Sequence, residues 1–167
     1  MRSIVTLPEG ETGPDREAGP SGADQHHRAL ENLYRQAPIN QLFQSTLEIT
    51  GEGLARIRFE VTSEVFHAAG AAHGTIYFKM LDDAAFYAAN TLATDRFLLT
   101  TSFNLHFTKP VREGAVVAEG KWISGRRRVF VAESRLVDAE GDEIGRGTGT
   151  FMRSRIALSG LPGYRPG

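Results

Sequence analysis

The stretch HAAGAAHGTIYFKMLDD, from His67 to Asp83, decides how the chain folds. Apolar side chains between Ile76 and Ala89 point in nearly every direction around a helical axis, which predicts a helix from about Thr75 to Asn90 that is buried on most sides. We expect the sheet of one chain to be too small to bury this helix, so that a second copy of the chain covers the rest. Two acids inside such a helix are costly unless they pair, accept hydrogen bonds or take part in chemistry.

Lys79 offers one explanation for the two acids, because it stands three residues before Asp82 and four before Asp83. A small solvated ion pair explains Asp83 as well as a functional role does, and it explains Asp82 less well. Adjacent residues of a helix point about 100° apart, so the two acids need not share one role. The residues alone do not assign these roles.

Strand patterns flank the helix on both sides. INQLFQSTLEIT and GLARIRFEV, joined by GEG, predict a hairpin before it. After it, residues 97–107 alternate with a period of two, with Phe97, Leu99, Phe103, Leu105 and Phe107 on the expected buried face. GAVVAEGKWI, RRRVFVAESRLV and IGRGTGTFM add three short strands, so we predict an α+β protein in which four consecutive strands form a meander.

The last of these strands carries Gly145, Gly147 and Gly149 on one face. Glycine weakens a strand, so three in a row indicate that another part of the backbone, such as the long helix, approaches closely. The alternative is a flexible strand at the edge of the sheet.

The composition limits the classes of function. The chain has 167 residues, a net charge of −1 and no cysteine, which excludes disulfides, thiolate metal sites and a cysteine nucleophile. Basic residues do not gather along one face, so we expect a small-molecule partner and no nucleic acid. A serine esterase is disfavoured because no G-x-S-x-G stretch is present.

The apolar content of the sequence indicates the domain limits. We predict a disordered tail over residues 1–25, one folded domain over residues 26–155 and a C-terminal tail over residues 156–167. The sequence shows neither the apolar core of a signal peptide nor a segment that could span a bilayer. We therefore expect a cytoplasmic protein with no membrane partner.

Several of these features together resemble a known family. HG opens the long helix, an aspartate follows nine residues after that histidine, and FTKPVREG and DAEGDEIGRGTGTF stand on the later strands. Over about Gln41 to Met152, the pattern resembles the hotdog-fold acyl-CoA thioesterases of the 4-hydroxybenzoyl-CoA and phenylacetyl-CoA thioesterase type. The resemblance implies a hotdog fold, in which a curled antiparallel sheet of about five to six strands wraps a long central helix, and assembly into dimers or dimers of dimers. It also implies hydrolysis of an acyl-CoA or aryl-CoA thioester, with coenzyme A present only as part of the substrate and no further cofactor.

The resemblance implies site residues by position. Asp82 matches the catalytic carboxylate, which acts as nucleophile or as general base, and Gly74 matches the glycine whose N–H polarises the thioester carbonyl. Thr100 falls where a hydroxyl positions the attacking water, whereas His67 replaces the usual Asn and Thr75 the second Gly of HGG. Asp82 lies eight residues after Gly74, about 12 Å along a straight helix, so both can serve one carbonyl only if antiparallel helices of two subunits meet.

The remaining candidates have structural alternatives of equal weight. His73 is expected to cap or pack beside the start of the helix, or else to act in catalysis. A metal site built from His67, His73 and an aspartate lacks any standard ligand spacing, so we expect no metal. Arg126 and Arg128 share one side of a strand and suit the phosphates of coenzyme A, although a solvated strand start explains them equally well.

Two other functions remain open. A non-catalytic protein of this fold would bind an acyl-CoA thioester and leave it intact. An enoyl-CoA hydratase or dehydratase would use His67 or His73 together with Asp82.

Overall fold

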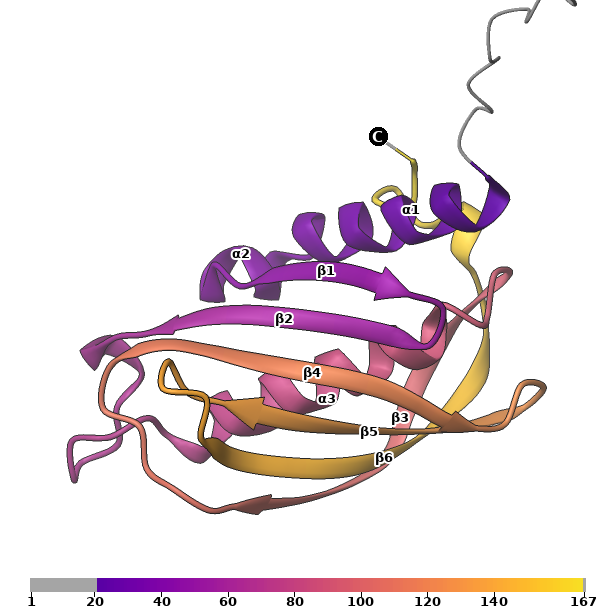
Figure 1. Cartoon of the computed structure of the whole chain (residues 1–167). Coiled ribbons are helices and arrows are strands. Elements are labelled where there is room, and N and C mark those ends of the chain that lie inside the picture. The colour runs from indigo at the N-terminus through magenta and orange to yellow at the C-terminus, as the bar shows by residue number, and fades with distance from the viewer. Residues whose placement is uncertain (1–20, 167) are drawn as a thin grey trace, which may run out of the picture.

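The computed structural model describes residues 21–166 (Figure 1). The predicted disordered tail, residues 1–25, falls largely outside these residues. Its predicted end at residue 25 is too late, because helix α1 (Gly22–Gln36) already begins at Gly22. Ser21 caps this helix by accepting a hydrogen bond from the Asp24 N–H, and the Asp24 carboxylate accepts one from the Ser21 N–H in return. This capping box marks the start of α1, and a prediction from amino-acid composition alone does not detect it.

One antiparallel six-stranded sheet curls around one long helix. After α1 come α2 (Pro38–Phe43), β1 (Thr46–Gly51), β2 (Leu54–Val61), η1 (Ser63–Val65), α3 (Gly74–Asn90), β3 (Arg96–Phe107), β4 (Gly114–Ser124), β5 (Val129–Val137), β6 (Glu143–Ala157) and η2 (Leu158–Gly160). The strand order is β1-β2-β4-β5-β6-β3. The predicted hairpin and the long helix wrapped by a curled sheet of five to six strands are confirmed (Figure 1).

The predicted meander of four strands is wrong in one respect. β4, β5 and β6 follow one another in the sheet, but β3 pairs with β6 at the outer edge and β4 pairs with β2. The connection after β3 passes the start of α3, where the Ala72 N–H donates to the Val111 carbonyl at 2.7 Å. Tyr77 holds this connection further, since its hydroxyl donates to the Lys109 carbonyl and accepts from the Val111 N–H.

A single chain buries most of α3, contrary to our expectation that this needs a second copy. The sheet covers one side, and α1 covers another by packing Leu30 and Tyr34 into the same core. The ring of Tyr34 meets that of Tyr87 edge-on, with centroids 5.2 Å apart. Phe78 remains 43% exposed on the side where β3 ends the sheet.

β3 departs from the predicted alternation in its first half. Leu98 is fully buried, whereas Leu99, predicted to face the core, is 47% exposed. The pairing with β6 shifts between Thr100 and Ser102, which marks a β-bulge. After the bulge, the side chains that had faced solvent face the core, and the reverse. Beyond the bulge, Phe103 packs against the core as predicted.

Two of the three predicted glycines of β6, Gly147 and Gly149, make room for an aromatic ring rather than for the helix. A Cβ added at Gly147 or Gly149 would lie about 2.4 or 2.5 Å from the ring of Phe103 on β3. β6 also lies inside the sheet, so the alternative of a flexible edge strand is wrong. The close approach of the helix falls instead on Gly120 of β4, where a Cβ would lie 2.0 Å from the Ala84 carbonyl oxygen.

The end of the described chain packs onto the domain instead of leaving it as a tail. Leu158 is fully buried, and the Tyr164 hydroxyl lies 2.5 Å from Nδ1 of the buried His26. Within residues 21–166, no helix is both long and apolar enough to cross a membrane.

Candidate active site

The start of α3 presents an N–H donor that the other described residues do not use. His73 is the N-cap, and its Nδ1 accepts a hydrogen bond from the Thr75 N–H at 3.2 Å, so the expected capping role is confirmed. The Gly74 N–H has no acceptor among the hydrogen bonds of the described residues. A helix N-terminus also carries a partial positive charge, so this N–H is suited to an oxygen that gains negative charge.

Gly74 opens into a hollow of about 340 Å³ that His67, Tyr77 and Phe107 help to line. A Cβ at position 74 would lie 3.1 Å from the Phe107 ring, so glycine lets the ring and the backbone come close. His67 is exposed, and its Nδ1 accepts from the Ala69 N–H at 3.0 Å, which fixes the ring in a local turn.

Asp82 lies further along α3, against the edge strand β3. Its carboxylate accepts a hydrogen bond from the Thr100 hydroxyl, with Oγ1 at 3.1 Å from Oδ1 and 3.4 Å from Oδ2. Burial raises the pKa of Asp82 from 3.8 to about 6, while the Thr100 hydrogen bond opposes this rise. A carboxylate with such a pKa is ionised at neutral pH and still basic enough to accept a proton from water.

Asp83 has a different environment, which separates the two acids that the sequence left unassigned. It pairs with Lys79, one turn earlier, and the side chain of Lys79 is only 11% exposed. The expected pairing of Asp83 with Lys79 is confirmed, but the expected solvation of the pair is wrong, because both side chains are largely enclosed. Asp82 instead accepts its hydrogen bond from β3, on the other side of the helix.

Within one chain, the predicted site residues form separate groups. His67, His73 and Gly74 surround the start of α3, whereas Asp82 and Thr100 meet two turns later. The first group supplies a hydrogen-bond donor and the second a carboxylate. Neither group alone can both attack a carbonyl and stabilise the resulting oxyanion.

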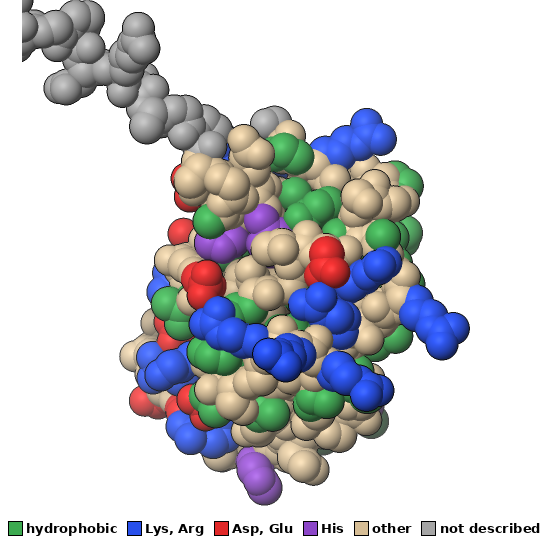
Figure 2. Space-filling model, turned by 90° about the vertical axis from the view of Figure 1, so that its right-hand side faces the viewer, with side chains coloured by type: hydrophobic (Ala, Val, Ile, Leu, Met, Phe, Trp, Pro, Cys, Tyr) green, Lys and Arg blue, Asp and Glu red, His purple; other side chains and the backbone are tan. Residues whose placement is uncertain are grey.

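The predicted phosphate-binding arginines lie at the turn between β4 and β5. Arg126 stacks on Trp122, with its guanidinium carbon 4.7 Å from the ring centroid, and lies 3.4 Å from the Glu52 carboxylate. The Arg128 carbonyl accepts from the Arg153 N–H, which brings the end of β6 beside this turn. The expectation that basic residues do not gather along one face is wrong, because Figure 2 shows that they gather on this end of the molecule. Hydrogen bonds and ion pairs connect five arginines at this end, at positions 96, 126, 128, 153 and 155, and the acids Glu52 and Asp95 pair with some of them.

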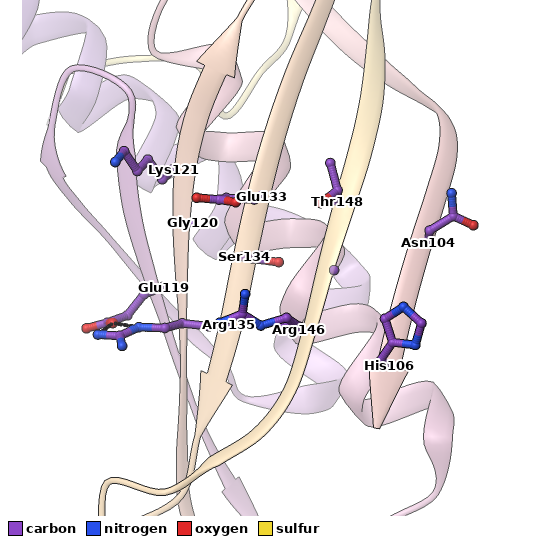
Figure 3. A pocket seen from close by; sticks show the side chains of 11 residues that line it. Asn104, His106, Glu119, Gly120, Lys121, Glu133, Ser134, Arg135, Arg146 and Thr148 are labelled. Atoms are coloured by element: carbon purple, nitrogen blue, oxygen red, sulfur yellow. Dashed lines mark hydrogen bonds and ion pairs between the residues drawn. The ribbon is translucent and has the colours of Figure 1, made fainter. Parts of the chain in front are cut away.

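A separate hollow of about 380 Å³ lies on the outer face of the sheet and contains no predicted site residue (Figure 3). Its charges are largely satisfied, since Arg135 pairs with Glu119 at 2.7 Å and Arg146 with Glu143 at 2.6 Å. Ser134 turns away from it and donates to the Leu81 carbonyl of α3. Nothing in this hollow brings a nucleophile and an acid together.

The described residues contain no group of three His, Cys, Asp or Glu side chains that could hold a metal ion. Sequence reasoning missed Phe107, which shapes the hollow beside Gly74 together with Tyr77. An aromatic residue on a strand is normally a core residue, so the sequence carried no signal for Phe107.

A helix N-terminus with an unused N–H and a half-buried carboxylate thus lie on one helix, and the sheet curls around that helix. A family model described as the thioesterase superfamily matches residues 69–144. A curated protein of Saccharolobus solfataricus named "Putative esterase SSO1253" is 25% identical over 123 residues, which cover 74% of this chain and 82% of that protein.

Solved structures share the fold. The Escherichia coli PaaI protein from the phenylacetic acid degradation operon matches with a TM-score of 0.71 at 18% identity, over 80% of this chain and 98% of that one. Thioesterase HI1161 from Haemophilus influenzae matches with a TM-score of 0.66 at 18% identity, over 74% of this chain and 86% of that one. The chain therefore has the hotdog fold of the thioesterase superfamily, and the resemblance found in the sequence is confirmed. The superfamily match supports thioester hydrolysis as the general class of activity.

Proposed function

We propose that this protein hydrolyses acyl-CoA or aryl-CoA thioesters to the free acid and coenzyme A, with Asp82 as the catalytic carboxylate. The observation that carries the proposal is the half-buried Asp82, which accepts a hydrogen bond from Thr100 and whose pKa is raised to about 6. The esterase-like relative and the superfamily match agree with a hydrolase. Coenzyme A enters only as part of the substrate, and the chemistry needs no further cofactor.

Asp82 can catalyse the hydrolysis by either of two routes. As a general base, Asp82 takes a proton from a water held near Thr100 while that water attacks the thioester carbon; the C–S bond then breaks, and coenzyme A leaves as a thiolate that is protonated. As a nucleophile, Asp82 attacks the carbon itself and expels the thiolate, and water then hydrolyses the resulting anhydride. Both routes place negative charge on the carbonyl oxygen, where the Gly74 N–H is a suitable donor.

The active unit is proposed to be a homodimer or a dimer of dimers, because Gly74 and Asp82 lie about 12 Å apart along one helix. β3 is the edge of the sheet, and an unpaired edge strand is a template for pairing with another chain. Phe78, Leu99 and Phe107 are each 43–54% exposed on or beside this edge. Antiparallel pairing there would bring Gly74 of the partner subunit toward Asp82.

Arg126 and Arg128 are proposed to bind the phosphates of coenzyme A. Guanidinium groups suit phosphate oxygens, and the surrounding surface has more arginines than acids (Figure 2). Replacing Arg128 by Ala should raise KM for a CoA thioester several-fold and leave KM unchanged for an acyl-pantetheine, which lacks the nucleotide.

The activity is tested by thiol release from a panel of aryl-CoA and short-chain to long-chain acyl-CoA thioesters. Asp82→Asn keeps the shape of the side chain and should lose turnover while it retains substrate binding. Asp142→Asn, at an exposed turn, is the matched control and should behave as the wild type. Binding without thiol release by the wild type would contradict the proposal and favour an acyl-CoA-binding protein, and water addition to an enoyl-CoA would indicate a hydratase.

The shared site is tested by mixing two inactive variants. Gly74→Pro removes the N–H donor at the first helical position, where proline breaks no helix hydrogen bond, and Asp82→Asn removes the carboxylate. Because a Cβ at position 74 must displace the Phe107 ring, circular dichroism first verifies that the proline variant folds. In a mixed dimer, one of the two sites then contains both an intact Gly74 and an intact Asp82. Random exchange makes half of the dimers mixed, so about a quarter of the wild-type activity should return. No recovery after verified subunit exchange would exclude a site built from two chains.

A further inference from the structure

Lys79 occupies an unusual position for a lysine, because its ammonium is enclosed between α2 and α3. Besides pairing with Asp83, it donates to Oδ1 of Asn40 at 2.6 Å. Its Nζ also lies 5.5 Å from the ring centroids of Tyr34 and Phe43, where a cation is attracted to the ring faces. An enclosed cation with this many partners is held in one place.

The residues that hold Lys79 come from the N-terminal segment. Asn40 is only 5% exposed, and its amide donates to the Tyr34 carbonyl at 2.8 Å. The Tyr34 hydroxyl in turn lies 2.6 Å from the Ser45 hydroxyl. Residues 34–45 precede the segment that the thioesterase family model matches, which begins at residue 69. This chain therefore uses a segment outside the matched region to fix a cation on its central helix.

We propose that Lys79 is a positioning residue for Asp82: held by Asn40 and Asp83, it offsets the charge of Asp83 so that Asp82 stays ionised and able to act on water. The role rests on the proposed function of Asp82. Lys79 need not touch the substrate, because it acts through the charge of the neighbouring acid.

Few groups act on Asp82 among the described residues. Burial raises its pKa most, the hydrogen bond from Thr100 lowers it, the charge of Asp83 raises it and the charge of Lys79 lowers it. Thr100 on β3 does not titrate, so the charges that act on Asp82 both come from α3. Without Lys79, two adjacent carboxylates would compete to remain charged, and one would take up a proton at a higher pH.

The test measures the titration of Asp82 directly, by NMR of carbon-13-labelled aspartate carboxyl groups in the intact protein. The signal that disappears in Asp82→Asn identifies the residue. Asp83→Asn leaves the cation unopposed and should lower the pKa of Asp82, whereas Lys79→Met removes the cation and should raise it. We expect the two variants to differ by roughly one pH unit or more, and the double variant to lie near the wild type. The acid limb of kcat/KM for thioester hydrolysis should move in the same order.

Arg56→Met is the matched control, because Arg56 pairs with Glu119 on the exposed face of the sheet and should leave the Asp82 signal unmoved. The proposal is overturned if the Asp82 titration does not follow the order Asp83→Asn, wild type, Lys79→Met. Should Lys79→Met not fold, Lys79→Gln, which removes the charge and keeps a donor to Asn40, takes its place and should raise the pKa of Asp82 in the same way. A protein that follows this order but releases no thiol would refute the proposed function and leave the electrostatic role of Lys79 intact.

Discussion

Asp82→Asn should make the folded protein more stable at neutral pH, even though it removes the proposed catalytic group. Burial raises the pKa of Asp82 from 3.8 to about 6 in the folded chain, and the unfolded chain has the ordinary value. Between these two values the folded state binds more protons than the unfolded state, so stability falls as the pH rises through this window. Below about pH 4 both states are protonated and the cost disappears.

The size of the effect follows from the two pKa values. A difference of about two units corresponds to about 3 kcal/mol of stability at pH values above the window, which is an upper limit. Asp82 is not fully enclosed, and solvent screening reduces the cost of its charge. We therefore expect Asp82→Asn to gain about 1–2 kcal/mol at pH 7.5 and close to nothing near pH 4.

The assay is urea unfolding from about pH 4 to pH 8 at one protein concentration, since subunit association adds to apparent stability. Asp142→Asn, on an exposed turn, is the control and should show no pH-dependent gain. A loss of stability in Asp82→Asn at pH 7.5, or a gain that does not change with pH, would refute the conclusion that this carboxylate is held at a cost.

Three further predictions concern other parts of the structure. Gly120→Ala should destabilise the fold by about 1–3 kcal/mol in urea unfolding, because its Cβ would meet helix backbone at 2.0 Å, whereas Gly160→Ala, with nothing within 4 Å, should be neutral. In the wild type kcat/KM should fall below about pH 6, and Thr100→Val should shift this limb upward by roughly one unit in a pH–rate profile, because the hydrogen bond that lowers the pKa of Asp82 is lost. Phe78→Ser should weaken self-association in light scattering, since this ring is 43% exposed beside the sheet edge.

The sequence predicted the main elements well where one signal dominated. The continuous apolar run defined α3 to within one residue at its start, and GEG located the hairpin between β1 and β2. Strand order could not be predicted in the same way, because which strands become neighbours depends on long-range packing. The placement of β3 beside β6 relies on contacts such as the Phe103 ring over Gly147 and Gly149, which no local pattern encodes.

The candidate site was predictable in its residues but not in its electrostatics. The resemblance supplied Asp82, Gly74 and Thr100, and the structure adds that Thr100 donates directly to the Asp82 carboxylate. The partners of Lys79 lie near position 40, far from it in sequence. The periodicity of apolar residues shows which face of a helix a residue occupies, but it does not show which distant segment covers that face.

The two acids of α3 face different surroundings, and that division connects stability with assembly. Asp83 points to the N-terminal helices, where a cation neutralises it, whereas Asp82 points to β3, the open edge of the sheet. In the proposed dimer, a partner at this edge would bury Asp82 further and by itself make its charge still more costly. The same partner brings the positive end of its own α3, which favours an anion and so offsets that cost. In such a dimer, the partner would therefore increase the energetic cost of the Asp82 charge and at the same time supply a hydrogen-bond donor that offsets this cost, which would allow an acid to persist on an otherwise apolar helix.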